Sequence, residues 1–336
     1  MLDEDDILKK LKLSPFEPVS WAKKGVQQSL AAYYYPYNPI IKNNNTQHIQ
    51  LPDGDQLFTA FNFPTIPHNN KRIVLMLHGL SGSYTSKYMI RITQKLNQHG
   101  ITTVRMNLRG HGVGRRLASK LYHGGISEDP SAVLQHLAKE FPDSPVTVLG
   151  FSLGANIIMK LAGEYKHPLG NMDSLVAVSP PLDLYSCTEL INSPANQFLE
   201  QYFSRTLVTE VKKIHKQTKL PLPAFPQNIS VFEFDELYTS KMNGYENAIH
   251  YYNECSALPY VHDIHFPTFI LHAKDDPLIL KDNFEKLPIK SNFDILLTEQ
   301  GGHVGWLAKG GKRWMDEAVV NWILHINRNK LTIPQN

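Results

Sequence analysis

A serine between two glycines, in the pentapeptide GFSLG at 150–154, is the feature that most constrains the fold of this chain. The residues 146–149 before it, three of which are apolar, are typical of a short buried strand, and residues 155–163 after it are typical of an apolar helix. When G-x-S-x-G lies between a strand and a helix, the sharp turn places the serine hydroxyl above the edge of the sheet. The turn is so tight that neither flanking position can hold a side chain, so both are glycine. We therefore predict that Ser152 is a nucleophile at the edge of a sheet.

Strand and helix patterns alternate on both sides of this motif. An antiparallel hairpin over 49–63 comes first, and the later alternation indicates an α/β fold with a mostly parallel central sheet and helices on both faces. The strand patterns are continuous apolar runs, as expected for strands buried on both faces. The other predicted strands are 73–77, 101–106, 146–149, 174–178, 268–272 and 294–298, and the predicted helices are 5–13, 87–99, 130–141, 155–163 and 312–327.

The alternation of strand and helix patterns stops after residue 181. The sequence therefore predicts an α/β core with an inserted segment and an N-terminal extension. Residues 49–181 and 263–330 are expected to form the α/β core. Residues 182–262 carry helical patterns, prolines and aromatics without a clear strand, and we expect an inserted helical cap over the carboxyl edge of the sheet. Residues 1–48 are expected to be an N-terminal extension packed on the core. Its aromatic cluster at 33–37 leaves peripheral contact with a lipid surface as an alternative.

Composition excludes several classes of protein. A net charge of +3 without a basic stripe argues against nucleic acid as a partner. The acidic start without an apolar stretch argues against a signal peptide, and every apolar run is shorter than the roughly 20 residues of a membrane span. Two cysteines, Cys187 and Cys255, fit a reducing compartment, and we expect a cytoplasmic protein.

A serine nucleophile needs a base, and the base needs an orienting acid. In open α/β sheets these groups collect where strands end, and this fold presents them in the order serine, acid, histidine. His303, on a paired-glycine loop after the last predicted strand, is the expected base for Ser152. Asp276 is the favoured acid, while the adjacent Asp275 and the earlier Asp183 stay open as alternatives.

The glycine-rich segment HGLSG at 78–82 follows the strand at 73–77 and should lie beside the serine turn. Acyl transfer requires donors aimed at the developing oxyanion. We expect the backbone N–H groups of Leu80 and Leu153 to supply them. His78 is interpreted as a structural residue of this loop, with direct catalysis as the less favoured alternative.

Other polar motifs favour structural roles. Arg109 is interpreted as an internally paired arginine rather than a substrate contact. The histidines and aspartate at 261–265 match no zinc spacing, so we expect a loop there and no metal. Phosphate-binding glycine motifs are also missing from the sequence, and no cofactor is expected.

Taken together, these segments resemble the α/β-hydrolase superfamily, specifically its YheT-like (type 4 AB-hydrolase) branch. The resemblance implies an α/β-hydrolase fold, Ser152, Asp276 and His303 as a charge-relay set, and cofactor-free hydrolysis of carboxylic esters, either acylglycerols or short- to medium-chain acyl esters. Residues 111–114 depart from the branch, which usually carries a cysteine, serine and glycine run there, so the resemblance says less about the substrate than about the mechanism. The matching segments are 78–83, 109–112, 121–130, 150–156, 251–259, 267–277 and 297–306.

Three functions remain compatible with these residues. The leading hypothesis is a serine esterase that cleaves an ester with an apolar acyl group through an acyl-enzyme. An acyltransferase would use the same residues with an alcohol in place of water, and a non-catalytic sensor would use the pocket to bind a small apolar ligand. A dehalogenase or epoxide hydrolase is disfavoured because those enzymes need a carboxylate where this chain has Ser152.

Overall fold

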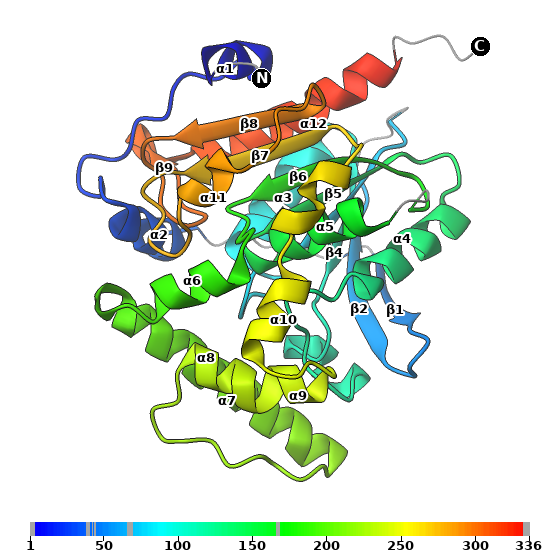
Figure 1. The fold of residues 1–336 in the computed structure, drawn as a ribbon. Helices are drawn as coiled ribbons and strands as arrows, with labels where there is room; N and C mark the ends of the chain where they lie inside the picture. Colours follow the sequence, from blue (N-terminus) through cyan, green and yellow to red (C-terminus); the bar gives the residue numbers. More distant parts are fainter. Residues whose placement is uncertain are drawn as a thin grey trace.

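The computed structural model describes residues 4–37, 41, 43, 45–65, 70–165 and 169–331. Eight strands form one sheet in the order β1-β2-β4-β3-β5-β6-β7-β8 (Figure 1). The pairs β1–β2 and β2–β4 are antiparallel, and all other pairs are parallel. The strands are β1 (Asn45–Gln50), β2 (Gln56–Asn62), β3 (Ile73–Leu77), β4 (Thr102–Met106), β5 (Val146–Phe151), β6 (Met172–Val178), β7 (Thr268–Ala273) and β8 (Phe293–Thr298).

The central strands β3 to β7 are buried along almost their whole length because both faces of the sheet are covered, and β3 is apolar throughout. Alternate residues of β3 enter different clusters: Leu75 packs with residues of α4 and α5, whereas Val74 and Met76 pack with α1, α3 and α12. The helices are α1 (Glu4–Leu11), α2 (Gly25–Tyr34), α3 (Lys87–Gln98), α4 (Glu128–Glu140), α5 (Leu153–Glu164), α6 (Leu184–Ile191), α7 (Gln197–Thr218), α8 (Val231–Phe234), α9 (Ser240–Met242), α10 (Ala248–Cys255), α11 (Asp282–Glu285) and α12 (Trp314–Leu331). The α/β fold class predicted from the sequence is confirmed.

Residues 182–262 contain several helices, joined by turns and by an irregular stretch between α7 and α8, and they contain no strand. Helices α6 to α10 gather on one side of the molecule, away from α1 and α12 (Figure 1). Short turns of 3-10 or π-helix link them, and the segment 261–265, expected to be a loop, enters one of these. The short helical segments of the chain are η1 (Gly112–Leu117), η2 (Pro194–Asn196), η3 (Asp235–Thr239), η4 (Leu258–Asp263) and η5 (Lys309–Gly311). The cap boundaries at 182 and 262 stay a prediction.

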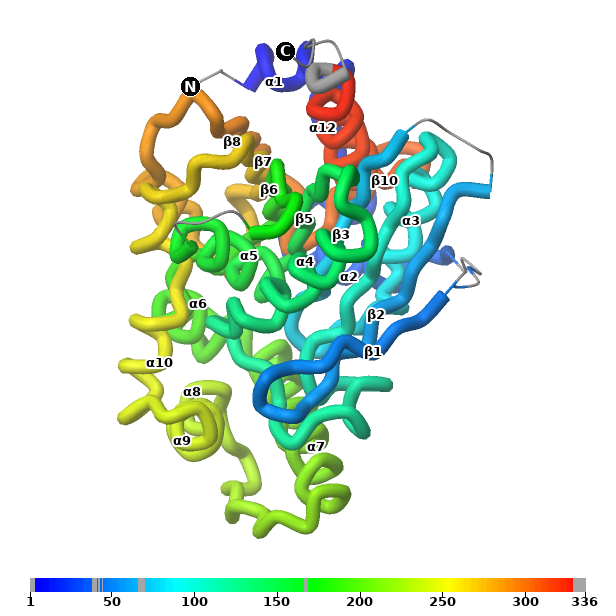
Figure 2. Tube along the Cα trace, turned by 90° about the vertical axis from the view of Figure 1, so that its right-hand side faces the viewer, coloured from blue at the N-terminus to red at the C-terminus, as the bar shows by residue number. Residues whose placement is uncertain are grey.

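Two helices of the N-terminal segment lie against the C-terminal part of the fold. Helix α1 lies beside α12 in both Figure 1 and Figure 2, and Lys10 forms an ion pair with Asp294 of β8 at 2.6 Å. Helix α2 and a small antiparallel sheet of β9 (Leu307–Ala308) and β10 (Lys312–Arg313) were not predicted from the sequence. Parts of the expected 1–48 extension, namely 1–3, 38–40, 42 and 44, lie outside the described residues.

Among the described residues, burial strongly lowers the pKa of three histidines. Burial lowers the pKa of His78 to about 3, that of His123 to about 3 and that of His272 to about 4. In the unfolded chain each takes up a proton near its ordinary pKa of about 6.5. The stability that these neutral side chains contribute is therefore complete above that value, and it is lost as the pH falls towards the folded-state pKa.

We expect acid to destabilise the protein through these histidines. Between about pH 6.5 and pH 5.5 the free energy of unfolding should fall by about 1 kcal/mol for each of them. His272 offers a clean test, because neither ring nitrogen has a hydrogen-bond partner and the ring stacks on Phe284 at 3.9 Å. His272→Phe should make the pH dependence of urea unfolding shallower by about 1 kcal/mol over the same interval. An unchanged slope in this variant would contradict the prediction.

Candidate active site

Ser152 occupies a sharp turn between β5 and α5. Its backbone has a positive φ of 51°, and its N–H donates to the carbonyl of Val178 on the neighbouring strand at 2.9 Å. The flanking glycines are required by close approach. A Cβ at Gly150 would collide with the carbonyl of Gly154, and one at Gly154 would collide with the carbonyls of Leu77 and His78. The turn therefore holds the serine at the junction of β5, α5 and the loop after β3.

The loops after β7 and β8 bring a carboxylate and an imidazole to this serine. His303 Nε2 lies 2.8 Å from Ser152 Oγ, and His303 Nδ1 lies 2.8 Å from Asp276 Oδ2. The other oxygen of Asp276 accepts from the N–H of Leu278 at 2.8 Å, and the carboxylate is fully buried. The three side chains thus form one continuous hydrogen-bonded line from segments far apart in the sequence.

The two alternative acids do different things. Asp275 turns away from the imidazole, and its Oδ1 accepts from the N–H of Gly302 at 2.9 Å. Burial raises the pKa of Asp275, although that hydrogen bond acts in the opposite direction. Asp183 caps α6 by accepting from the N–H of Ser186 at 3.1 Å. Of the three candidates, only Asp276 is bonded to His303.

The glycine-rich loop after β3 lies against the serine turn, and a Cβ at Gly79 would lie 2.9 Å from the Cβ of Ser152. Two tyrosine hydroxyls fix this loop on either side of Leu80: Tyr88 accepts from the N–H of Gly79 at 3.1 Å and Tyr122 from that of Ser81 at 2.9 Å.

His78 lies at the start of this loop and is structural, as the sequence favoured. Its Nδ1 bonds the carbonyl of Gly79 at 2.8 Å, and its Nε2 accepts from the N–H of Leu108 at 3.0 Å. The imidazole therefore ties the loop after β3 to the loop after β4.

Arg109 is internally paired. Its guanidinium is buried and bonds the carboxylates of Asp53, Asp55 and Asp129, the last at 2.5 Å. This network holds the loop after β4, which includes the unusual segment 111–114. Within the described residues, no group of three or more histidine, cysteine or acidic side chains is arranged to hold a metal ion.

Helix α2 contacts the loops after β7 and β8, and these contacts were not predicted from the sequence. Ser29 Oγ accepts from the backbone N–H of His303 at 2.8 Å. Gln28 is fully buried and accepts from the N–H of Leu307 at 2.8 Å. Gly25 lies so close to the carbonyl of Asp275 that a Cβ there would collide with it. No local pattern in residues 25–34 signals these contacts, because their partners lie more than 240 positions away in the chain.

An apolar wall adjoins the serine turn. Leu153 packs on a buried cluster of the helical segment that includes Leu184 and Tyr251. A Cβ at Gly124 would lie within 3.3 Å of side-chain atoms from all three of these residues, so they converge on one point. The converging atoms are methyl groups of Leu153 and Leu184 and the hydroxyl of Tyr251, so leucine and tyrosine side chains lie on this side of the serine turn.

A serine on a strand–helix turn of a mostly parallel sheet, bonded to a histidine that follows the last strand, defines the class of α/β-hydrolases. Within that class, the chain belongs to the family described as serine aminopeptidase, S33, whose model matches residues 68–289. The resemblance inferred from the sequence is thereby confirmed, and the chain is a hydrolase.

Several proteins share sequence with this chain over most of its length. "Putative esterase YheT" of Escherichia coli is 31% identical, with 82% of this chain and 84% of that protein aligned. The monoacylglycerol lipase of Saccharomyces cerevisiae is 32% identical over 78% of this chain and 61% of its own length. The human phospholipase ABHD3 is 25% identical over 87% of this chain and 73% of its own length.

Solved structures share the fold. The esterase Pf2001 of Pyrococcus furiosus superposes with a TM-score of 0.53 at 18% identity, over 87% of this chain and 97% of that one. The 2,6-dihydroxy-pseudo-oxynicotine hydrolase gives a TM-score of 0.60 at 15% identity, over 93% and 74% of the two chains. At these identities the likeness concerns the fold alone. In the described part of this chain, no helix has the length and apolar character needed to cross a membrane.

Proposed function

We propose that this protein is a serine esterase that cleaves carboxylic esters through an acyl-enzyme. The observation that carries the proposal is the hydrogen-bonded line from Ser152 Oγ through His303 to the buried Asp276 carboxylate. His303 Nε2 takes the hydroxyl proton as the serine oxygen attacks the ester carbonyl. Asp276 holds the ring orientation and stabilises the imidazolium that forms.

The remaining steps use the same groups. His303 returns the proton to the departing alcohol, which leaves the acyl group bonded to Ser152 Oγ. A water then gives a proton to His303 and attacks the acyl carbonyl. As the bond between the acyl carbon and Ser152 Oγ breaks, His303 returns that proton to Oγ, which releases the acid and restores the serine. We assign the N–H groups of Leu80 and Leu153 as the donors that stabilise the oxyanion in both halves of the reaction, since their loops meet at Ser152.

The side chains beside Ser152 support a class of substrate. The apolar residues that converge beside Leu153 support an ester with an apolar acyl group, either a short- to medium-chain ester or an acylglycerol. The names of the relatives, a monoacylglycerol lipase and a phospholipase among them, support a role in lipid metabolism. Two free, buried cysteines support a reducing compartment, for which we propose the cytoplasm.

A fluorophosphonate probe tests the proposal because it reacts only with an activated serine hydroxyl. We expect one probe per chain, attached to Ser152, and hydrolysis of p-nitrophenyl esters over a range of acyl lengths. Absence of labelling would favour a ligand sensor. Addition of an alcohol during turnover distinguishes an esterase from an acyltransferase. A new ester as the main product would identify an acyltransferase, whereas we expect mainly the free acid.

We expect Ser29→Ala to lower kcat about tenfold while leaving KM nearly unchanged, because small displacements of a catalytic group are costly. The variant removes the acceptor for the His303 N–H, so the imidazole is held less firmly. Thr209→Ala is a matched control: both hydroxyls donate to the carbonyl four residues earlier, but Thr209 is on an exposed helix turn. Equal kcat values for the two variants would contradict this role for Ser29.

A further inference from the structure

The two faces of helix α2 are reversed relative to an ordinary surface helix. An ordinary helix buries its large apolar side chains and exposes polar ones. The buried residues here are small or polar: Gly25, Gln28, Ala31 and Ala32. The residues turned to solvent are Val26, Leu30, Tyr33 and Tyr34, with exposed fractions of 45%, 38%, 62% and 71%.

The contacts of the inner face explain why its residues are small or polar. Gly25 is pressed against the carbonyl of Asp275, and Gln28 and Ser29 bond the chain around His303. That face is therefore committed to close polar contacts with the catalytic loops. The large side chains of the outer face do not pack against these loops. Their presence on the surface therefore calls for a reason other than packing.

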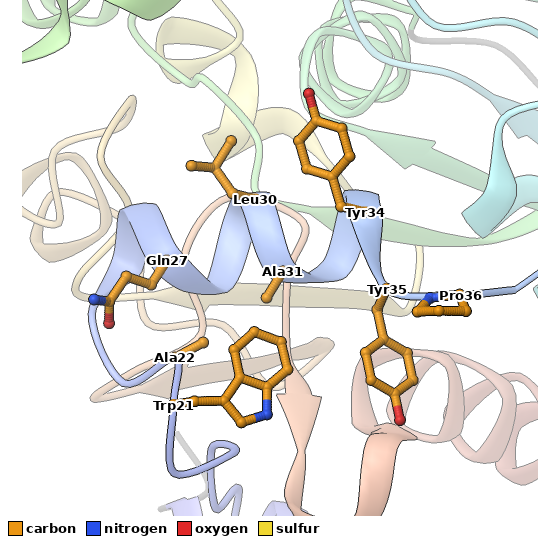
Figure 3. Close-up of a pocket in the computed structure, with 8 residues that line it drawn as sticks. All are labelled: Trp21, Ala22, Gln27, Leu30, Ala31, Tyr34, Tyr35 and Pro36. Carbon is orange, nitrogen blue, oxygen red and sulfur yellow. The ribbon is translucent and has the colours of Figure 1, made fainter.

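The apolar area continues beyond the helix. A groove of about 460 Å³ along α2 is lined by Leu30, Tyr34, Trp21 and Tyr35, among others. Figure 3 shows Leu30 and Tyr34 on one side of the helix and Trp21 and Tyr35 on the other. The rings of Trp21 and Tyr35 stack at 6.4 Å, and Trp21 is 59% exposed.

Positive charge borders this area. Lys23 and Lys24 are exposed immediately before α2, and residues 19–37 contain no aspartate or glutamate. Lys87 lies on the other side, where its Nζ donates to the carbonyl of Tyr33 at 2.9 Å and lies 5.8 Å from the ring centre. We call the set of Trp21, Lys23, Lys24, Leu30, Tyr33 and Tyr34 the α2 surface.

We propose that the α2 surface docks on a phospholipid surface with anionic headgroups. Tryptophan and tyrosine favour the boundary between headgroups and hydrocarbon, and lysines beside them pair with lipid phosphates. Because Ser29, on the same helix, contacts His303, docking brings the proposed active site close to esters held in the lipid layer; this consequence rests on the proposed function.

Co-sedimentation with vesicles of phosphatidylcholine and phosphatidylglycerol in equal amounts tests the docking. We expect the wild-type protein to bind, and the triple variant Leu30→Gln, Tyr33→Ser, Tyr34→Ser to bind at least about tenfold more weakly. The double variant Lys23→Gln, Lys24→Gln should lose about fivefold per lysine on these vesicles and little on pure phosphatidylcholine. Ile289→Gln is the matched control, since Ile289 is 77% exposed and precedes β8, and it should bind like the wild type.

Three results would overturn the proposal: no vesicle binding by the wild type, equal binding by the triple variant, or self-association that the triple variant abolishes. The last would assign the α2 surface to a second copy of the chain. Hydrolysis of water-soluble p-nitrophenyl acetate is measured in parallel. Vesicle binding without hydrolysis would contradict only the proposed function, and hydrolysis without vesicle binding would contradict only the docking.

Discussion

Ser152→Ala is expected to lower kcat for ester hydrolysis by about 10⁶-fold, the loss seen when a serine hydrolase loses its nucleophile. The variant removes the atom that attacks the carbonyl and carries the acyl group. A residual rate about 10³–10⁴-fold above that in water should remain, since the oxyanion donors and substrate binding are still present. Steady-state kinetics on a p-nitrophenyl ester measures the loss.

Ser81→Ala is the matched control for this experiment. Ser81 lies in the adjacent glycine-rich loop, and its buried hydroxyl has no hydrogen-bond partner, so its removal should change kcat less than about threefold. Mass spectrometry of the wild-type protein quenched during turnover should find the acyl group on the peptide that contains Ser152. A Ser152→Ala variant with wild-type activity would show that the mechanism is wrong.

Asp276→Asn is expected to lower kcat by about 10⁴-fold, because an amide in this position favours the wrong tautomer of the histidine. The adjacent residue provides the control. Asp275 bonds Gly302 rather than the imidazole, and an asparagine oxygen can accept the same hydrogen bond. Asp275→Asn should therefore stay within about tenfold of the wild type.

Comparison of the two variants in the same assay decides between the two carboxylates. The free energy of unfolding of each variant, from urea titration, separates a loss of catalysis from a loss of folded protein. Equal losses of kcat in two stably folded variants would contradict the assignment of Asp276 as the orienting acid.

The central strands and the positions of Ser152 and His303 were predictable from the sequence for a common reason. Buried parallel strands are continuous apolar runs, and their carboxyl ends meet at one edge of the sheet. Polar residues that directly follow such runs are therefore brought together, whatever their separation in the chain. The predicted strand 73–77 agrees with β3 at both ends, and the predicted strand 268–272 ends one residue before β7 does.

The choice between Asp275 and Asp276 needed coordinates. Neighbouring side chains in a turn point in different directions, and the sequence has no period there from which to infer which one faces the imidazole. The structure places Asp276 Oδ2 2.8 Å from His303 Nδ1 and gives Asp275 a backbone partner.

Local patterns in the sequence determined the sheet, its covering helices and the turn that carries Ser152, since strand burial and glycine-dependent turns depend on neighbouring residues. Tertiary structure alone decided that α2 supports His303 and turns its large side chains to solvent. The bond from Ser29 to His303 joins residues 274 positions apart. Such a contact depends on how whole elements pack, and it leaves no periodic pattern in either segment.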